Sequence, residues 1–311
     1  MDILNVVNLS KTYKTGKKAL ANLNFHVEKG EILGFLGPNG AGKSTTINII
    51  STLLKADAGS IVYFDDPDLS GKEIKKRLGI VPQDIALYED ISAYANVKFF
   101  AALYGVKRQV MNEKVEGALA KVGLLARKDD KPATFSGGMK RRLNIACAIA
   151  HDPQLIIFDE PTVGIDPQSR NHILESIKIL RNNGATVIYV THYMEEVQQI
   201  CDRVIIMDGG AILLNDKLTN ILNQFSGTNY RLDLSGKPTD KDILALEKLT
   251  GINTVTVIEQ NSLLLRMDNA ASLDQALDFL NDHGLVLTDI SKQEQRLEDV
   301  FLALTGKSLR D

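Results

Sequence analysis

The chain has 311 residues, of which 44% are hydrophobic and 24% charged, a balance typical of a folded protein long enough for two domains. Its net charge of −3 and isoelectric point near 6.0 exclude a global basic field that would attract nucleic acid. Two cysteines, Cys147 and Cys201, are too few for a disulfide framework, and we expect both to be reduced. No stretch approaches about 18 uninterrupted apolar residues, and the first residues lack a signal-peptide pattern, so we expect any membrane role to depend on a partner chain.

The beginning of the chain predicts strands that lead to a glycine-rich turn. Residues 3–7 and 20–27 alternate apolar and polar side chains, and residues 31–37 form a short apolar run typical of a buried strand. Tyr13 lies between the first two strands. Its spacing alone favours an ordinary edge aromatic over a ring that stacks on a base.

The next segment, GPNGAGKST, matches the phosphate-binding pattern G-x-x-x-x-G-K-[ST]. Glycine has no Cβ, so the backbone can curl tightly enough to aim several N–H groups at one polyphosphate. Lys43 is expected to reach the β- and γ-phosphates, and the Ser44 hydroxyl suits Mg²⁺, which prefers hard oxygen ligands. Residues 45–54 predict a buried helix whose N-terminus adds to the anion site. The residues predicted to bind phosphate here are Gly37, Pro38, Asn39, Gly40, Ala41, Gly42, Lys43, Ser44 and Thr45.

A second apolar strand, predicted at residues 78–81, leads to Gln83. Ligand groups in α/β folds follow strand ends, so the Gln83 amide is expected to contact Mg²⁺ or an attacking water; a surface glutamine is the alternative. Residues 85–110 and 112–122 then predict helices. These helices form either a packed helical subdomain or a docking surface, and the two interpretations are compatible.

The stretch FSGGMKRRLNIACAIA, residues 135–150, predicts a long helix capped by Ser136. Gly137 and Gly138 leave N–H groups exposed at its start, which is typical of an anion-binding helix end. A cap needs only the serine, and paired glycines destabilise a helix, so we expect the backbone to approach another group closely. The basic residues that follow are expected to form a solvated face; they are Lys140, Arg141 and Arg142.

Two further apolar strands end in polar residues. Residues 155–158 predict a central buried strand that delivers Asp159 and Glu160 at its carboxyl end. Asp159 suits coordination of Mg²⁺, and Glu160 suits general-base catalysis on water. Residues 187–190 predict another strand. His192 follows it and is placed to contact a γ-phosphate or the catalytic water, although a lone histidine is more often structural.

Residues 226–228 predict a linker to a second domain. Over residues 230–290 the predicted order is strand, helix, strand, strand, helix, strand, which suggests a small ferredoxin-like domain. A last helix is predicted at residues 297–304, and the segment shows no catalytic constellation. The expected domains are an α/β domain at residues 1–225, with a helical subdomain at about 85–150, and an α+β accessory domain at 226–311.

These stretches together resemble the nucleotide-binding subunits of ABC transporters, over about residues 3–219. The glycine-rich segment is similar to Walker A, Gln83 to the Q-loop, and FSGGM to the ABC signature. LIIFDE resembles Walker B, Asp166 lies in a segment similar to the D-loop, and His192 matches the switch histidine. Tyr13 matches the family's base-stacking aromatic, which reverses the expectation from spacing. The resemblance implies a P-loop NTPase with a RecA-like core, an antiparallel β subdomain and a helical subdomain.

The resemblance also implies an ATP hydrolase that uses Mg²⁺ and acts as a dimer. In the family two subunits pair head to tail, so that ATP on Walker A of one meets the signature, here residues 136–138, of the other. Asp166 lies at the dimer contact. Motion then passes to a separate membrane subunit through a groove at residues 85–104. The resemblance implies a peripheral protein on the cytoplasmic face of the membrane, most simply a homodimer, with no nucleic-acid partner.

Met139 departs from the family pattern, because many members have Gln there. Residues 135–143, 161–170 and 297–306 are nonetheless similar to multidrug and daunorubicin-resistance exporters. The implied function is to power export of a drug, peptide or lipid-like substrate. One alternative is a soluble ABC protein that acts on the ribosome or nucleic acid, but such relatives usually carry two cassettes or a long coiled-coil insertion. Another alternative is a P-loop kinase or GTPase, but the signature at residues 136–138 would have no role in such a protein.

Overall fold

The computed structural model describes residues 1–224, 228–267, 272–293 and 297–305. The chain forms two compact units. One unit comprises Met1–Leu218 together with the end of the chain from Phe301, and the other comprises Thr219–Val300. The domain boundary expected between residues 225 and 226 lies outside the described residues and stays a prediction.

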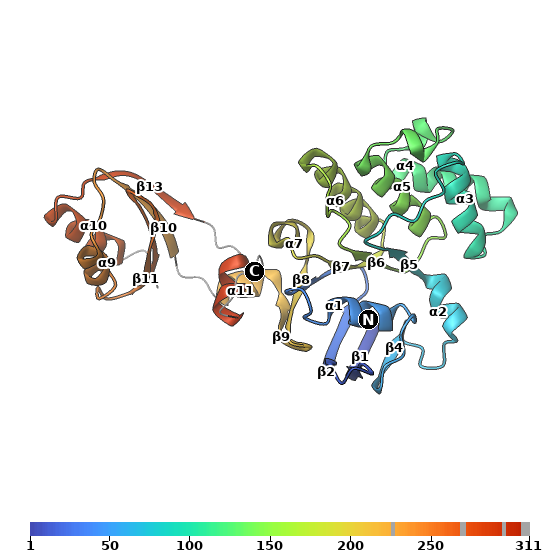
Figure 1. Cartoon of the computed structure of the whole chain (residues 1–311), viewed down its shortest axis with the longest axis horizontal. Coiled ribbons are helices and arrows are strands. Elements are labelled where there is room, and N and C mark those ends of the chain that lie inside the picture. Colours follow the sequence, from blue (N-terminus) through green and yellow to red (C-terminus); the bar gives the residue numbers. More distant parts are fainter. Residues whose placement is uncertain (225–227, 268–271, 294–296, 306–311) are drawn as a thin grey trace. The chain divides into compact units, whose positions relative to one another are not determined.

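The larger unit contains a six-stranded sheet in the order β5-β6-β7-β3-β8-β9 (Figure 1). The first five of these strands run parallel, and β9 pairs antiparallel with β8. Parallel strands covered on both faces are built from continuous apolar runs, and the five parallel strands of this sheet follow that rule. At the carboxyl ends, Val81 pairs with Phe158, and Val190 pairs with both Asp159 and Phe35. The strands are β3 (Ile32–Leu36), β5 (Leu78–Val81), β6 (Leu155–Asp159), β7 (Thr186–Val190), β8 (Arg203–Asp208) and β9 (Ala211–Lys217).

A second, antiparallel sheet in the order β2-β1-β4 shares one hydrophobic core with helix α1 (Lys43–Ile50) and the central sheet. Helix α1 is shorter than the predicted helix at residues 45–54. Thr52 adopts a left-handed φ of 61°, and Leu53 and Leu54 both donate backbone N–H groups to the Asn48 carbonyl, which closes the helix end. The three strands are β1 (Asp2–Thr12), β2 (Lys18–Glu28) and β4 (Ala58–Tyr63).

The helical part of this unit lies beside β5 in Figure 1. The prediction of a helix from residue 85 was wrong for its first turns, because α3 begins only at Ala93. Buried Asn96 exchanges two hydrogen bonds with the backbone of Tyr88, at 2.8 and 2.9 Å, and so folds the preceding loop back over the helix. The helices of this part are α3 (Ala93–Leu103), α4 (Met111–Lys121) and α5 (Gly137–Ile149).

Three further helices, α2, α6 and α7, belong to the larger unit, and α8 begins at Leu218 and continues into the smaller unit. Both cysteines are buried free thiols, as expected, with Cys147 on α5. The four helices are α2 (Gly71–Arg77), α6 (Pro167–Asn182), α7 (Met194–Ile200) and α8 (Leu218–Gln224).

The smaller unit has the predicted order of strands and helices. Its four described strands form an antiparallel sheet in the order β11-β12-β10-β13, and their inward residues share a separate core with the two helices between them. Each unit therefore has a core of its own. The elements are β10 (Thr228–Leu234), α9 (Asp240–Leu246), β11 (Ile252–Glu259), β12 (Ser262–Met267), α10 (Ser272–Asp282) and β13 (Leu287–Gln293), followed by α11 (Leu297–Thr305).

A buried ion pair joins the two sheets of the larger unit. The Arg203 guanidinium, at the start of β8, donates to both oxygens of the Glu31 carboxylate, at 3.2 and 2.7 Å. It also donates to the His26 carbonyl of β2 and to Asn215 of β9. Because every other acceptor around it is neutral, the cation depends on Glu31 for its charge balance.

Arg203→Met removes this cation and leaves the Glu31 carboxylate buried without a countercharge, with only the Glu28 N–H still donating to it. We expect the free energy of unfolding to fall by about 3 to 5 kcal/mol, the usual effect of breaking a buried pair. Equilibrium urea unfolding measures it. Lys178→Met, which breaks an exposed pair with Glu175, is the control and leaves the unfolding midpoint near its original value. Equal effects of the two changes would show that the buried pair does not hold the sheets together.

Candidate functional site

The glycine-rich turn links β3 to α1, and its glycines are needed for two different reasons. Gly40 and Gly42 have φ angles of 83° and 105°, in the left-handed region that favours glycine. Gly37 instead permits close packing, because a Cβ there would lie 2.4 Å from the Met207 carbonyl oxygen of β8. The curl expected from all three glycines therefore comes from two of them.

Lys43 is held inside this turn. Its ammonium donates to the Gly37 carbonyl at 2.6 Å and to the Pro38 carbonyl at 3.1 Å, and only 6% of the residue is exposed. Burial lowers the pKa of Lys43, while the nearby charges of Glu160 and Asp159 oppose that shift. The cation is thus desolvated but balanced by two carboxylates at the end of β6.

Asp159 and Glu160 leave β6 in different directions. Asp159 is the last residue of the strand, and burial raises its pKa, assisted by Glu160 and opposed by Lys43. Glu160 has a φ of 47°, which is left-handed and strained for a residue with a side chain. Its Oε1 atom lies 3.3 Å from Nδ1 of His192. The two strand ends, β6 and β7, therefore bring a carboxylate and an imidazole into contact.

One pocket, with a volume of about 430 Å³, contains most of the predicted site residues. Tyr13 lies at the turn, and its hydroxyl is 3.1 Å from Oγ1 of Thr45. Of the residues predicted to bind ATP or Mg²⁺ within the same chain, Gly37, Pro38 and Asp159 do not line the pocket, although Lys43 contacts the first two directly. The pocket is lined by Tyr13, Lys17, Ala19, Asn39, Gly40, Ala41, Gly42, Lys43, Ser44, Thr45, Gln83, Glu160, Val163 and His192.

Sequence reasoning missed three of these lining residues: Lys17, Ala19 and Val163. Lys17 belongs to a tight turn in which the Tyr13 N–H donates to its carbonyl at 2.9 Å, so the aromatic and the cation face the same pocket. Lysines are common in polar loops, and the sequence offers no signal that separates this one. Val163 follows Glu160 by three residues and lines the pocket because the backbone turns at Glu160, which has a left-handed φ. The sequence did not predict that turn.

The signature segment lies outside this pocket. The Ser136 hydroxyl accepts a hydrogen bond from the Met139 N–H at 3.3 Å, and Ser136 and Gly137 are exposed at the start of α5. Gly138 is buried, and a Cβ there would lie 2.2 Å from Oγ of Ser169 on α6. The close approach expected from the paired glycines is thus partly internal: Gly138 packs on its own chain, whereas Gly137 faces outward.

Asp166 caps the neighbouring helix α6. Its carboxylate accepts a hydrogen bond from the Ser169 N–H at 2.9 Å, and the hydrogen bonds to Ser169 lower the pKa of Asp166. The residue is exposed and lies outside the pocket. Ser169 therefore contacts both the cap of α6 and the second signature glycine.

The solvated face expected after the signature was wrong for Arg141. This residue is only 3% exposed, and its guanidinium donates to the carbonyls of Pro82 and Gln83. Lys140 pairs with Glu89 at 2.5 Å, and Arg142 donates to the Val122 carbonyl at 3.0 Å. The tertiary fold, which places α5 against the end of β5, turns Arg141 inward.

A glycine-rich turn after one parallel strand, a carboxylate pair after a second and a histidine after a third define a P-loop ATPase. Residues 20–163 match the family model described as ABC transporter. The chain is 44% identical to the linearmycin resistance ATP-binding protein LnrL of Bacillus subtilis, over 99% of this chain and 100% of that protein. The chain therefore belongs to the ABC transporter family, and it is an ATP-binding, ATP-hydrolysing subunit.

Other relatives agree with this assignment. The doxorubicin resistance ATP-binding protein DrrA of Mycobacterium tuberculosis is 32% identical, over 98% of this chain and 94% of that protein. The dimeric, post-hydrolysis structure of the ATP-binding cassette MJ0796 with ADP and Pi has a TM-score of 0.61 and 30% identity, over 69% of this chain and 98% of that one. The predicted family, fold and ATPase activity are confirmed. Among the described helices, none has the length and apolar character needed to cross a bilayer.

The packing of Gly138 on Ser169 gives a stability prediction. Gly138→Ala places a methyl group against the Ser169 side chain, so α5 and α6 must separate, and we expect a lower thermal midpoint. Ser169→Gly in the same chain removes the obstructing atoms and is expected to recover most of that loss. Circular dichroism during heating measures both. A double variant as unstable as Gly138→Ala would contradict an internal packing role.

Proposed function

We propose that two copies of this chain pair head to tail and power export of a drug-like compound through a separate membrane subunit, from the cytoplasmic face of the membrane. The names of similar proteins support the direction and the class of substrate: linearmycin resistance, doxorubicin resistance and Nod factor export. These relatives favour transport over the alternative of a soluble protein that acts on the ribosome or nucleic acid.

The observation that carries this proposal is the separation of the signature from the pocket of its own chain. Ser136 and Gly137 expose a capped helix start with unpaired N–H groups, yet neither lines the pocket around Lys43. Exposed N–H groups at a helix start suit a phosphate. A second copy supplies that phosphate when its own pocket faces this helix, with Asp166 at the contact.

Within each pocket we propose the roles that the motifs and the family resemblance imply. The backbone and Lys43 hold the β- and γ-phosphates, and Tyr13 stacks on the base. Ser44, Gln83 and Asp159 offer hydroxyl, amide and carboxylate oxygens, the hard ligands that suit Mg²⁺. A magnesium ion bound there would neutralise charge on the phosphate oxygens.

Glu160 is the proposed general base that accepts a proton from the attacking water. His192 contacts Glu160 and is placed to orient both that carboxylate and the γ-phosphate for attack by water. The strained backbone at Glu160 supports this role, because it directs the side chain away from the strand and into the pocket.

Glu160→Gln keeps the size of the side chain but removes the base. We expect ATP turnover to fall by at least about a hundredfold while ATP still binds, so that a dimer accumulates. Size-exclusion chromatography with ATP and Mg²⁺ measures it. Addition of Gly137→Ala should return the protein to a monomer, because the new methyl group meets only Ile165 of its own chain, at 3.9 Å, and can obstruct only a partner. A double variant that still dimerises would contradict the head-to-tail arrangement.

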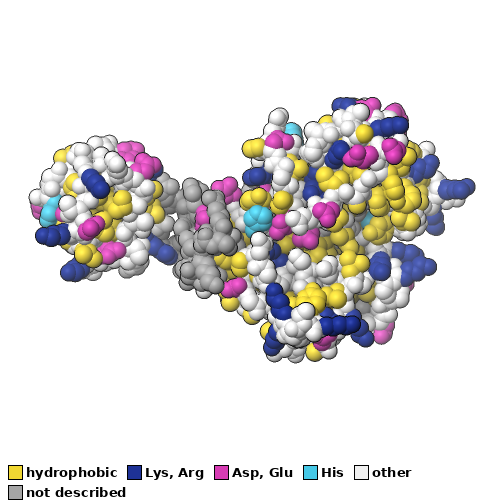
Figure 2. Space-filling model, viewed as in Figure 1, with side chains coloured by type: hydrophobic (Ala, Val, Ile, Leu, Met, Phe, Trp, Pro, Cys, Tyr) yellow, Lys and Arg dark blue, Asp and Glu magenta, His cyan; other side chains and the backbone are white. Residues whose placement is uncertain are grey.

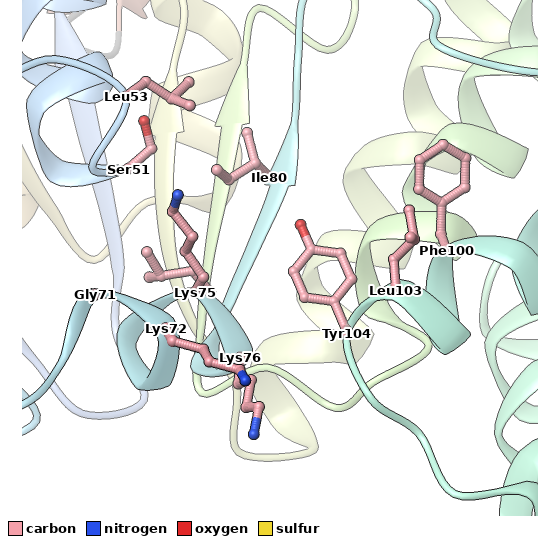
Figure 3. Close-up of a pocket in the computed structure, with 11 residues that line it drawn as sticks. Ser51, Leu53, Gly71, Lys72, Lys75, Lys76, Ile80, Phe100, Leu103 and Tyr104 are labelled. Atoms are coloured by element: carbon pink, nitrogen blue, oxygen red, sulfur yellow. The ribbon is translucent and has the colours of Figure 1, made fainter.

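The proposed contact with the membrane subunit is a pocket of about 620 Å³ beside the expected groove. Figure 3 shows apolar and aromatic side chains from α3 on one side and lysines from α2 on the other. In Figure 2, hydrophobic side chains gather over the helical part, next to a cluster of basic side chains. None of the described lining residues is acidic, so an amphipathic segment with apolar and acidic residues suits this surface. Its lining includes Leu53, Lys72, Lys75, Lys76, Phe100, Leu103 and Tyr104.

Leu103 is 67% exposed in this groove and tests the contact. Leu103→Asp should abolish co-purification of the membrane subunit from detergent-solubilised membranes, because it places a charge in an apolar contact. ATP hydrolysis by the isolated chain should not change. Leu244→Asp, at a 58% exposed leucine of the smaller unit, is the matched control. Retention of the membrane subunit by Leu103→Asp would show that the docking surface lies elsewhere.

A further inference from the structure

Arg141 lies in α5, shortly after the signature residues, and reaches across to the Q-loop. One guanidinium nitrogen donates to the Pro82 carbonyl at 2.7 Å, and the other terminal nitrogen donates to the Gln83 carbonyl at 2.5 Å. Pro82 and Gln83 follow directly on β5. A single side chain therefore holds two consecutive peptide groups at the end of a strand.

Burying the Arg141 guanidinium in this way lowers the stability of the fold. The residue is 3% exposed, its acceptors are neutral carbonyls, and its Nε has no hydrogen-bond partner. The charge of Asp84 acts on the guanidinium, but no carboxylate is paired with it directly, and burial lowers the pKa of Arg141. A buried charge without a direct carboxylate partner is costly, and an apolar side chain of similar volume is often at least as stabilising. Two directional bonds from a rigid, planar group fix the geometry of the loop instead.

Buried Asn96 holds the far end of this loop through the backbone of Tyr88, whereas Arg141 holds its start. Residues 82–92 contain no regular helix or strand, and Gln83 itself is exposed where it lines the pocket. Lys140, the neighbour of Arg141 on α5, pairs with Glu89 farther along the same segment, at 2.5 Å. That ion pair is partly exposed, at Glu89 above all, and contributes little by itself. Arg141 is thus the buried tie between the signature helix and the residue that we assign to Mg²⁺.

We propose that Arg141 is a positioning residue that makes Gln83 and the signature turn move as one body. The proposal rests on the head-to-tail arrangement above. When the signature of one chain engages the ATP of its partner, the displacement of α5 reaches the backbone of Gln83 in the chain's own pocket. Each pocket then receives its Q-loop glutamine in the orientation that depends on the other pocket being filled.

A double-mutant cycle on the full chain tests this role, with Arg141→Met and Gln83→Ala alone and together. Arg141→Met is expected to lower the kcat for ATP at least about tenfold, as the loss of charged hydrogen bonds predicts, with little change in ATP affinity. In the Gln83→Ala background the same change should have almost no further effect, because the group that Arg141 positions is gone.

Arg142→Met is the matched control. Arg142 is the next residue of α5, and it also donates to a backbone carbonyl and has an unpartnered Nε, but its acceptor is Val122 of the helical part. A kcat near the wild-type value is expected for it. If Arg142→Met and Arg141→Met act alike, or if the effects of Arg141→Met and Gln83→Ala multiply, the positioning role is overturned.

Two further readouts keep the result decisive. If Arg141→Met does not fold, Arg141→Lys carries the same cycle, since an ammonium retains the charge but cannot hold both carbonyls in the guanidinium geometry. Wild-type protein without turnover would contradict the proposed function, whereas an active wild type with an unaffected Arg141→Met contradicts only this inference.

Discussion

The site depends on the register of the parallel strands. Val190 of β7 pairs with Asp159 on one side and with Phe35 on the other, so three chain segments leave the sheet at one level. The glycine-rich turn, the carboxylate pair and the histidine follow these strands, and Gln83 follows β5 one strand farther out. Backbone hydrogen bonds thus place groups that are far apart in sequence within a single pocket. A slip of one residue in any strand would send its polar residue to the other face.

The electrostatics of the pocket follow from that convergence. Burial disfavours the charged forms of both Lys43 and Asp159, so it lowers the pKa of the lysine and raises that of the aspartate. The charge of each residue counteracts the pKa shift of the other. The Lys43 ammonium meets its remaining hydrogen-bonding needs with the neutral carbonyls of Gly37 and Pro38. A triphosphate offers the same ammonium anionic acceptors, which form stronger bonds than carbonyls do. The turn therefore holds the Lys43 ammonium in place before ATP binds, and an anionic ligand would give this ammonium stronger hydrogen bonds than the carbonyls do.

Local pattern was enough to predict the strands, the turn and the polar residues at the strand ends, because each depends on a short run of sequence. It failed where packing between distant segments decides the outcome. Arg141 lies in a basic run that is typical of a solvated face, and only the position of α5 against β5 buries it. The helix predicted from residue 85 begins only at Ala93, because Asn96 holds the backbone of Tyr88 in the preceding loop, and these hydrogen bonds have no signature in helical periodicity. The roles of the pocket residues remain predictions.

The two signature glycines show how one motif serves two chains. Gly138 is used inside the molecule, where it lets α5 approach Ser169 and the capped start of α6. Gly137 is exposed, a Cβ there would meet only Ile165 at 3.9 Å, and the residue is available to a partner. The exposed Ser136 and Asp166 therefore lie on helix starts that are locked together by the contact between Gly138 and Ser169. A partner that binds the start of α5 therefore also contacts the start of α6, because the two helices are held together. Any movement of these helix starts is transmitted to Gln83 by the buried Arg141. On this argument the internal packing of the signature is a precondition for its use between chains.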